Sequence, residues 1–511
     1  APVLGASADF ALFSKNGAVS NTGLSQLTGN VGTNNGAVTN FGNVDGVMHN
    51  ADGATATAAA DLTIAYNQLN AAVPTLFPAS LLGNGQVLTA GIYSVAGGAT
   101  LSNSLTLNGQ GNANAVFIFQ VQGAMSSTAA SSVLLTNGAQ ACNVFWKVEG
   151  AVSFAANTAF KGTLIANNAA IVLNAGTSIE GRALSTTGAV TVSGVKVTTP
   201  LGCGRAVLNG PASPPLASVA CYTLFSGNGA VTNTGISFVT GDVGTNVGLT
   251  TGYQALNVAG TVHPNPDVST AQCAADLGTV YTFLNTLPTD IELLYPASFG
   301  NGLVLTPHTY LLDGAAVLTG EVSLNAQNNA NAVFVIKIKG ALSTSTYASV
   351  ALLNGAQAKN VFWKVDGAVN LNDYADFKGT IVANNGAVSL NTGVTVTGRA
   401  LTTNGAFATF GINAQMTPGC NNTVATSPLI NSKPSVSIYP SPFSSEINVS
   451  LEAPVGDEGA NLTFYNSCGV VVLQTKLTQK QSNIPLNLPR GIYIYKVVSN
   501  NNTYTGKLVS Q

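Results

Sequence analysis

Few residues in this sequence have the types and spacing that metal binding requires. Its three histidines are His49, His263 and His308, and near His49 only Asp45 and Asp52 could serve as further ligands. A zinc site needs three or four His, Cys or carboxylate ligands placed close together. The sequence therefore predicts no metal site, and we expect His49 and His263 to make loop hydrogen bonds.

The acidic residues and glycines do not form a catalytic pattern either. Asp61 and Asp276 lie inside predicted helices, and no pair of carboxylates recurs in both halves of the chain, whereas acid-base catalysis on sugars uses two facing carboxylates. The segment Gly109-Gln110-Gly111 lacks the strand, helix and acidic residue of a dinucleotide-binding motif. We therefore predict no catalytic residues, no cofactor and no enzymatic activity.

For two arginines and two tryptophans the sequence predicts structural roles rather than catalytic or binding roles. Arg182 and Arg399 each follow a glycine in nearly uncharged sequence, so we expect their guanidinium groups to bond loop carbonyls and hold neighbouring segments together. Trp146 and Trp363 lie in alternating strand patterns, which predicts core positions rather than platforms for carbohydrate stacking.

Composition excludes several classes of partner. Only 7% of the 511 residues are charged and the formal net charge is -2, whereas an ordinary soluble domain carries about 25% charged residues. Without a cluster of Lys and Arg the chain cannot neutralise a run of phosphates, so we expect no nucleic-acid partner. Polar residues and glycines interrupt every apolar run before it reaches the length of a membrane span, so we expect no membrane insertion.

The first residues and the cysteines bear on the compartment. The chain begins Ala1-Pro2-Val3 without Met, from which we expect a secretory signal peptide to have been removed and the protein to be secreted or held on the outer cell surface. Six cysteines are too few for a disulfide scaffold, and they allow one or two bridges whose connectivity the sequence leaves open. They are Cys203 and Cys420, which end equivalent segments, and Cys142, Cys221, Cys273 and Cys468, which have no counterparts.

The chain contains two copies of one domain. Asn143-Val144-Phe145-Trp146-Lys147-Val148 recurs as Asn360-Val361-Phe362-Trp363-Lys364-Val365, an offset of 363 − 146 = 217 residues. The prolines near 211–215 predict an extended linker between the copies. A second break precedes a segment in which charged residues return. We therefore expect copy 1 at 1–204, a linker at 205–218, copy 2 at 219–420, a linker at 421–434 and a third domain at 435–511.

Each copy has one helix and many short strands. Leu62, Ala65, Tyr66, Leu69 and Val73 form an apolar stripe in a predicted helix over 55–73. A second stripe precedes Pro288, which ends the helix, and it consists of Leu277, Val280, Tyr281, Leu284 and Leu287.

The remaining short Val, Ile, Leu and Thr runs, broken by Asn-Gly and Gly-Ala turns, favour a β-solenoid, with a β-sandwich as the alternative. The predicted fold is therefore mainly β, with two tandem β-solenoids each braced by one long α-helix.

Ordered motifs then indicate a family. Asn137-Gly138-Ala139-Gln140, the Phe-Trp-Lys motif, Phe160-Lys161-Gly162-Thr163 and Gly181-Arg182-Ala183-Leu184 each recur in copy 2. In this order they resemble the microbial ice-binding protein family, whose domain is an irregular β-solenoid braced by a helix. The resemblance implies that the protein adsorbs to an ice crystal surface through one flat solenoid face and inhibits ice growth and recrystallisation.

The same resemblance implies ice-contacting positions. The family often has Thr-Ala/Gly-x-Thr/Asn on successive coils, and the partial matches here predict an ice-contacting set at Thr128, Ala129, Ser131, Asn157, Thr158, Thr177, Ser178, Thr392 and Thr395. At matched places copy 2 carries Tyr347, Asp373, Tyr374 and Asp376, which would roughen a flat face. We therefore expect copy 1 to be the better ice binder.

The last segment resembles the sorting domain of the bacterial type IX secretion system. Ile438-Tyr439-Pro440-Ser441-Pro442-Phe443, Leu488-Pro489-Arg490-Gly491-Ile492-Tyr493 and Thr505-Gly506-Lys507-Leu508-Val509 match its motifs in order, with Ser441 in place of the usual Asn. The resemblance implies a small C-terminal β-sandwich that engages the type IX secretion machinery, and a Bacteroidetes-type source. The alternative function is a surface adhesin or carbohydrate-binding spacer built on β-solenoids.

Overall fold

The computed structural model describes residues 1–203, 207–420, 436–451, 459–466, 469–499 and 502–511. Two compact units, Ala1–Asn421 and Asn422–Gln511, make up the chain, and the first contains both copies. Cys468 and the predicted linker at 421–434 lie outside the described residues.

Copy 1 consists of two parallel sheets that share the same coils. Its 13-stranded sheet contains β1 (Phe10–Ser14), β3 (Gln26–Thr28), β4 (Asn30–Thr33), β6 (Met48–Asn50), β8 (Gln86–Thr89), β9 (Gly91–Val95), β11 (Ser104–Asn108), β12 (Phe117–Val121), β14 (Ser132–Thr136), β15 (Val144–Val148), β17 (Ala159–Ala166), β19 (Ser178–Ser185) and β21 (Lys196–Thr198). Its eight-stranded sheet contains β2 (Val19–Thr22), β5 (Val38–Thr39), β7 (Leu81–Gly83), β10 (Ala99–Ser102), β13 (Met125–Ser127), β16 (Val152–Phe154), β18 (Ile171–Leu173) and β20 (Val190–Ser193).

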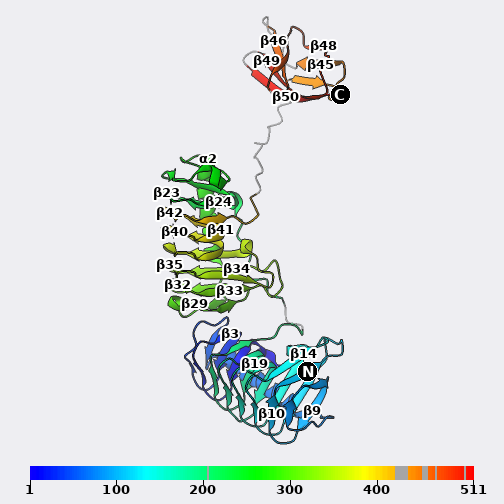
Figure 1. Cartoon of the computed structure of the whole chain (residues 1–511), viewed down its shortest axis with the longest axis vertical. Helices are drawn as coiled ribbons and strands as arrows, with labels where there is room; N and C mark the ends of the chain where they lie inside the picture. The colour runs from blue at the N-terminus through cyan, green and yellow to red at the C-terminus, as the bar shows by residue number, and fades with distance from the viewer. Residues whose placement is uncertain (204–206, 421–435, 452–458, 467–468, 500–501) are drawn as a thin grey trace. The chain divides into compact units, whose positions relative to one another are not determined.

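Copy 2 repeats this plan, and Figure 1 shows β23, β42, β40, β35, β32 and β29 stacked one above another. Its 14-stranded sheet contains β22 (Tyr222–Ser226), β24 (Phe238–Thr240), β25 (Asp242–Thr245), β27 (Val258–Ala259), β28 (Ile291–Glu292), β30 (Leu303–Leu305), β31 (Thr309–Leu312), β33 (Glu321–Asn325), β34 (Phe334–Ile338), β36 (Ser349–Leu353), β37 (Val361–Val365), β39 (Asp376–Ala383), β41 (Thr395–Thr402) and β43 (Asn413–Gln415). Its eight-stranded sheet contains β23 (Val231–Thr234), β26 (Thr250–Thr251), β29 (Phe299–Gly300), β32 (Ala316–Thr319), β35 (Leu342–Thr344), β38 (Val369–Leu371), β40 (Val388–Leu390) and β42 (Phe407–Phe410).

Glycines bend the large sheet of each copy into two faces. In copy 1 the long strands β17 and β19 pass through Gly162, which has φ 108°, and Gly181. A Cβ atom at Gly181 would lie 1.8 Å from the Gly162 carbonyl oxygen, so only glycine fits where these two coils cross the bend. Each copy is therefore a β-solenoid, as predicted, and the structure shows that its strands are parallel and that it has three faces.

One α-helix covers one of the three faces in each copy. Helix α1 (Gly53–Ala71) begins at Asp52, whose carboxylate accepts from the Thr55 backbone N–H at 2.9 Å, and α2 (Val268–Thr286) begins at Asp267 in the same way. The α1 stripe packs on Phe13, Phe145, Ile165 and Leu184 of the sheet. The predicted helices are confirmed with shifted ends, and Val73 lies beyond α1 with 73% of its surface exposed.

The coil interior is filled by apolar side chains that stack along the solenoid. In copy 1 the register places Tyr93, Phe119 and Trp146 on successive coils, with the Phe119 and Trp146 ring centroids 3.9 Å apart. Trp146 and Trp363 are both fully buried, and each indole N–H donates to a backbone carbonyl. Their predicted core role is confirmed.

Buried arginines and disulfides tie the ends of each copy to its body. Arg182 Nε donates to the Ala8 carbonyl at 2.7 Å, and Arg399 Nε donates to the Ala220 carbonyl at 3.1 Å, as predicted. The disulfides join Cys142 to Cys203 and Cys221 to Cys420, and Cys273 is free and lies on the buried side of α2.

The described part of the linker lies against copy 2. It contains no strand before the short 3-10 helix η3 (Ala217–Cys221). The Asn209 carbonyl accepts from the Val333 backbone N–H at 2.9 Å, and the Asn329 side chain donates to the Leu208 carbonyl at 3.0 Å. Residues 208–209 are thus bonded to copy 2 rather than free of it.

The C-terminal unit has two antiparallel sheets around one small core, in agreement with the predicted β-sandwich. One contains β44 (Val436–Tyr439), β45 (Glu446–Leu451) and β48 (Gln481–Pro485). The other contains β46 (Ala460–Tyr465), β47 (Val471–Leu477), β49 (Gly491–Ser499) and β50 (Asn502–Ser510).

Candidate functional site

The eight-stranded sheet of copy 1 presents an outer surface without charge, which we call the small-polar face. Its central column consists of side chains paired in register from coil to coil. They are Thr39, Ser20, Thr191, Val172, Ser153, Ser126, Thr100 and Leu81. Val172 and Leu81 are the two positions in this column without a hydroxyl. Side chains on neighbouring coils are spaced about 4.8 Å apart.

A column of alanines runs beside these hydroxyls and is held by a regular backbone ladder. The carbonyls of successive alanines accept from the next coil, each bond measuring 2.9 Å. The alanines in this column are Ala37, Ala18, Ala189, Ala170, Ala151 and Ala124. Because the ladder spans all these coils with one bond length, the face is ordered before it meets any partner.

Copy 2 has an equivalent small-polar face on its own eight-stranded sheet. Its central column contains more variation, with an amide and two apolar residues among the hydroxyls. In register it consists of Thr251, Thr232, Ala408, Ser389, Asn370, Ser343 and Val317. The accompanying alanines include Ala230, Ala406, Ala387, Ala368 and Ala341, bonded by the same ladder at 2.8–2.9 Å.

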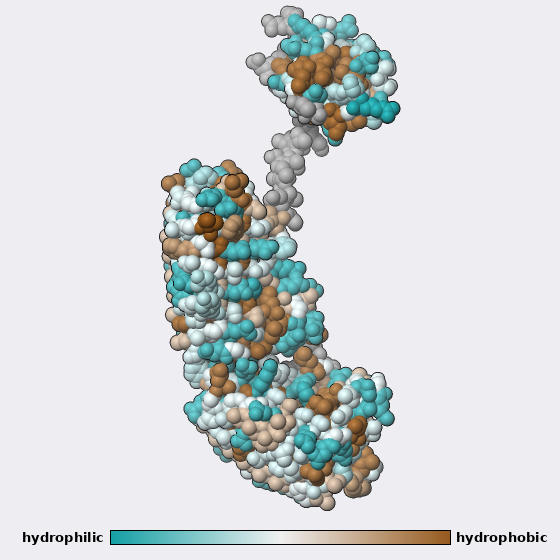
Figure 2. All heavy atoms as spheres, viewed as in Figure 1, coloured by the Kyte–Doolittle hydropathy of each residue, from teal (hydrophilic) through white to brown (hydrophobic). Residues whose placement is uncertain are grey.

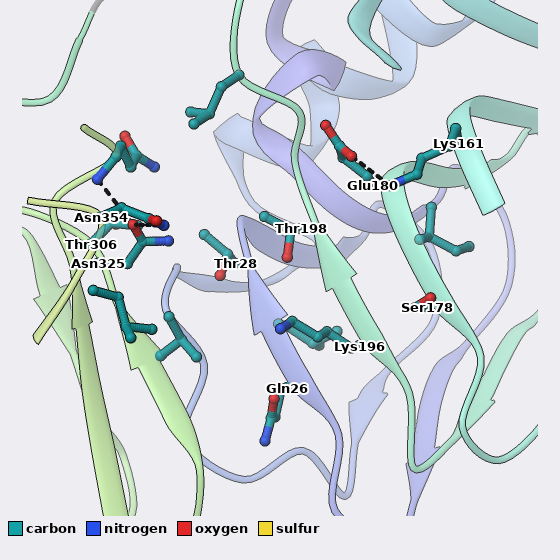
Figure 3. Close-up of a pocket in the computed structure, with 16 residues that line it drawn as sticks. Gln26, Thr28, Lys161, Ser178, Glu180, Lys196, Thr198, Thr306, Asn325 and Asn354 are labelled. Atoms are coloured by element: carbon teal, nitrogen blue, oxygen red, sulfur yellow. Dashed lines mark hydrogen bonds and ion pairs between the residues drawn. The ribbon is translucent and has the colours of Figure 1, made fainter. Parts of the chain in front are cut away.

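The remaining face of each copy carries ion pairs. In copy 1 Lys161 Nζ lies 2.7 Å from the Glu180 carboxylate, and in copy 2 Lys378 Nζ lies 2.6 Å from that of Asp376. Figure 3 shows Lys161, Glu180 and Lys196 around a pocket of about 540 Å³, whose other residues include Thr306, Asn325 and Asn354 of copy 2. We call these surfaces the charged faces. Charged groups retain their own hydration shells, so a charged face is poorly suited to bind solid water.

Three residues of the predicted ice-contacting set are buried and cannot contact any external surface. Ser131, Thr158 and Thr177 have no exposed area. The Thr158 hydroxyl donates to the Ala155 carbonyl at 2.8 Å, and that of Ser131 donates to the Thr128 carbonyl at 2.7 Å. The prediction was wrong for these three because the fourth residue of each corner turns inward. There the hydroxyls of Ser131 and Thr158 bond the backbone of their own corner, and that of Thr177 donates to the Ala155 carbonyl of the neighbouring coil at 3.4 Å.

The other six predicted residues are at least partly exposed but do not share one face. Thr128 and Ala129 lie at the corner where the small-polar face of copy 1 ends, and Asn157 and Thr392 lie at corner turns. Ser178 and Thr395 lie on the charged faces, where Ser178 pairs with Lys196 in register and Thr395 donates to Asp376 at 2.9 Å. For all six, contact with ice stays a prediction.

The small-polar face escaped the sequence analysis, although a short repeat marks it. Gly-Ala-Val-Ser/Thr occurs at 17–20, 36–39, 150–153 and 188–191 in copy 1, and at 229–232 and 386–389 in copy 2. In each instance glycine makes the turn, alanine occupies the ladder column, valine points inward and Ser or Thr points outward. The period-two alternation of a strand predicts this arrangement.

The residues first considered for chemistry have structural partners. His49 Nδ1 lies 2.6 Å from the Asp52 carboxylate, and His263 Nδ1 lies 2.6 Å from that of Asp267, so both histidines brace a helix start. The hydrogen bond from the Thr55 backbone lowers the pKa of Asp52. Within the described ranges, no group of three His, Cys, Asp or Glu side chains is placed to hold a metal ion.

A buried polar network joins copy 1 to copy 2. The Asp45 carboxylate accepts hydrogen bonds from the hydroxyls of Tyr310 and, at 2.8 Å, Thr306, while Asn43 Nδ2 donates to the Tyr295 carbonyl at 3.0 Å. Burial raises the pKa of Asp45 above its ordinary 3.8. This network fixes the end of copy 1 on copy 2 through side chains that water does not reach.

Such helix-braced parallel β-solenoids, each with one rigid and uncharged face, define a class of proteins that present ordered surfaces rather than catalytic pockets. Residues 13–198 and 225–411 match the model of a protein family described as ice-binding-like. The chain belongs to this family. A second model, the secretion system C-terminal sorting domain, matches residues 437–511 and confirms the predicted export and extracellular or cell-surface localisation.

Relatives and a solved structure agree with this family. The chain is 36% identical to an ice-binding protein of Nostoc sp. (strain HG1), over 35% of this chain and 67% of that protein. It is 32% identical to an ice-binding protein of Colwellia sp, over 36% of this chain and 78% of that protein. A crystal structure of an ice binding protein from an Antarctic Flavobacteriaceae bacterium is 69% identical, with a TM-score of 0.82, and the match covers 82% of this chain and 99% of that one.

Proposed function

We propose that this protein is exported and binds ice through the small-polar faces of its two solenoids, thereby inhibiting ice growth and recrystallisation. The observation that carries the proposal is the combination of hydroxyl and alanine columns with an unbroken backbone ladder. A surface of Ser, Thr and Ala can hold water in a regular arrangement, and it avoids the free-energy cost of removing water from charged groups. The rigid ladder means that little ordering entropy is lost on adsorption.

The surface composition supports the same function. Figure 2 shows that the visible surface of both copies is mostly of intermediate hydropathy, with hydrophilic and hydrophobic residues scattered in small groups. Among the described residues, no helix is long and apolar enough to cross a membrane. We infer that the partners are an ice surface and, through residues 437–511, the type IX secretion machinery. We also propose that the protein catalyses no reaction and needs no cofactor.

One substitution on each face tests the assignment of the ice-contacting surface. Ser153 is exposed at the centre of the small-polar face of copy 1, and Thr136 is exposed on the charged face of the same copy. Ser153→Tyr should sharply reduce thermal hysteresis because its ring lifts the ice lattice away from the ladder. Thr136→Tyr is the matched control, since it adds the same ring to an outward strand position, and it should leave hysteresis unchanged.

The free energy of unfolding of both variants should stay within about 0.5 kcal/mol of the wild type, as for ordinary surface substitutions. Equal loss of hysteresis in the two variants, or an effect of Thr136→Tyr alone, would show that ice contacts another face.

We also propose that copy 1 contributes more than copy 2, because Tyr347, Asp373 and Tyr374 border the small-polar face of copy 2. The equivalent substitution in copy 2, Asn370→Tyr, should therefore reduce hysteresis less than Ser153→Tyr.

A further inference from the structure

Two exposed tyrosines occupy a backbone conformation that bulky residues rarely adopt. Tyr347 and Tyr374 have φ values of 59° and 58°, and 70% and 51% of their surfaces are exposed. At the matched corners of copy 1 the same conformation is taken by Ala130 and Asn157. Left-handed backbone at a large side chain costs free energy, and such outliers concentrate at functional sites.

The two rings form a stack along the corner of copy 2. Their centroids are 5.1 Å apart and their planes differ by 10°. Below them the Tyr374 ring covers Gly393, where an added Cβ atom would lie 2.4 Å from the ring. One face of the Tyr374 ring is therefore covered by Tyr347 and the other lies over the backbone of the next coil.

On its other side the tyrosine stack ends at an open space between the Tyr347 ring and the corner at Gly320, which we call the Tyr347–Gly320 step. The corner that precedes Tyr347 in the stack is two residues shorter, because Leu318 pairs with Thr344 whereas Glu321 pairs with Ser349. This short corner has Gly320 at its tip, and an added Cβ atom there would meet nothing within 4 Å. The outer face of the Tyr347 ring is therefore free, with room for one more flat group.

The groups around this step select the chemistry of that flat group. Ser345 Oγ accepts from the Gly320 backbone N–H at 3.4 Å, and Thr346 and Glu321 are exposed neighbours of Tyr347 and Gly320 in sequence. The Glu321 carboxylate accepts from the Ser323 hydroxyl at 2.9 Å. Asp373 is exposed at the next corner, and Lys378 is already paired with Asp376 at 2.6 Å. The step is therefore negative, which disfavours phosphate backbones and acidic polysaccharides. A pyranose ring fits because its C–H face contacts the electron-rich ring face while its hydroxyls bond the polar groups.

We propose that the Tyr347–Gly320 step of copy 2 binds a sugar ring of a neutral polysaccharide. Tyr347 provides the stacking platform, Tyr374 holds that platform in position, and Gly320 leaves the space for the sugar. The site lies at a corner of copy 2 and differs from the hydroxyl columns proposed to contact ice. It gives the protein a way to hold polysaccharide beside an ice surface.

Saturation-transfer NMR on the full-length chain tests the proposal with defined neutral probes. The probes are cellohexaose, maltohexaose and laminarihexaose, and hexagalacturonate serves as the acidic comparison. We expect transfer from protein to the sugar C–H protons of at least one neutral hexaose and none to hexagalacturonate. Tyr347→Ala should weaken that binding at least tenfold, whereas Tyr347→Phe, which keeps the ring, should bind within threefold of the wild type.

A second variant blocks the step without removing the ring. Gly320→Asn should also weaken binding at least tenfold, because its side chain would occupy the space above Tyr347. Copy 1 has Asn103 at the equivalent corner with φ 52°, so asparagine is compatible with this backbone. The proposal is overturned if no neutral hexaose binds the wild type, if hexagalacturonate binds more tightly, or if folded Tyr347→Ala and Gly320→Asn proteins bind as the wild type does.

Discussion

At their outer corners, copy 1 and copy 2 have the same backbone path but opposite side-chain chemistry. In copy 1 the residue that turns inward is polar, at Ser131, Thr158 and Thr177, and in copy 2 it is apolar, at Ala348, Ala375 and Val394. The preceding tip is small in copy 1 and aromatic at two corners of copy 2. The turn itself is thus set by backbone hydrogen bonds, which leaves both its inner and outer side chains free to diverge.

The largest expected difference between the copies lies in their interiors. Trp146 stacks on Phe119, whereas the register partner of Trp363 is Ile336, and its closest ring, Phe377, is tilted by 53°. Replacing either tryptophan with alanine should cost about 3–5 kcal/mol. Trp146→Ala should cost about 0.5–1.5 kcal/mol more, because it loses the close stack on Phe119, whereas Trp363→Ala loses an edge contact to Phe299 with ring centroids 6.1 Å apart. Scanning calorimetry of the full chain measures both, and equal costs would show that the stack contributes nothing beyond its buried area.

Two equivalent tyrosines allow the stability contributed by the contact between the copies to be compared with that contributed within one copy. The Tyr310 hydroxyl lies within hydrogen-bond distance of both the Asp45 carboxylate and the Thr306 carbonyl, whereas the equivalent Tyr93 hydroxyl donates to the Thr89 carbonyl of its own copy. Tyr310→Phe removes a donor from a buried carboxylate and should cost about 1–3 kcal/mol, while Tyr93→Phe should cost about 0.5–1.5 kcal/mol. Thermal unfolding of the two variants decides this, and the opposite order would contradict the network between the copies.

The raised pKa of Asp45 predicts a pH dependence of the same network. Because burial raises its pKa above 3.8, the folded state binds the proton more tightly than the unfolded state does. The stability contributed by Asp45 is therefore complete below its unfolded pKa and is lost as the pH rises through the folded pKa.

Asp45→Asn cannot titrate, so the difference in unfolding temperature between wild type and Asp45→Asn isolates this group. We expect that difference to move in favour of Asp45→Asn between pH 4 and pH 8. A difference that does not change with pH, or moves the other way, would refute the assignment to Asp45.

The buried corner hydroxyls of copy 1 should contribute measurable stability. The Thr158 hydroxyl donates to the Ala155 carbonyl at 2.8 Å and accepts a hydrogen bond from the Ser127 hydroxyl at 2.7 Å. Thr158→Val keeps the shape but leaves these groups without partners, at a cost of about 1 kcal/mol. The converse control, Ala375→Ser in copy 2, tests whether that corner accepts a hydroxyl. Chemical denaturation of the full chain measures both, and a neutral Thr158→Val would mean that the corner needs no hydroxyl.

The smallest stability effect is expected at the aromatic tips. Tyr374→Asn places at this corner the residue that copy 1 uses as Asn157, which tolerates left-handed backbone well. The exchange loses one stacked pair and relieves one strained position, so the net change should stay within about 0.5 kcal/mol. A loss well above 1 kcal/mol would show that the tyrosine stack holds the corner together.

The sequence predicted the parts of the molecule that depend on pattern alone. The 217-residue repeat, the helix stripes, the inward tryptophans and the carbonyl-bonding arginines follow from periodicity and from the chemistry of single side chains. The first helix starts two residues before the predicted 55 because Asp52 caps it through Thr55, a signal shorter than the stripe.

The candidate site was only partly predictable, since it depends on register. A four-residue corner motif does not reveal that its third residue takes positive φ and turns the fourth inward, which is why Ser131, Thr158 and Thr177 were misassigned. The columns of the small-polar face come from strands far apart in the chain, such as β2 and β20, which pair Ser20 with Thr191. The Gly-Ala-Val-Ser/Thr repeat could have located them, because it fixes which residue of each coil points outward.

The junction between the copies also governs how far this architecture can extend. It joins unlike ends, so a chain whose ends carried both halves of the contact would polymerise into an open-ended fibre. The outer end of copy 2 lacks its half, since Ala259 pairs with Thr240 at the place where Asp45 bridges to Thr28 in copy 1. Alanine offers no carboxylate to the Tyr93 of another molecule. The buried polar contact that joins copy 1 to copy 2 therefore has no counterpart at this outer end, and it cannot be repeated from one molecule to the next.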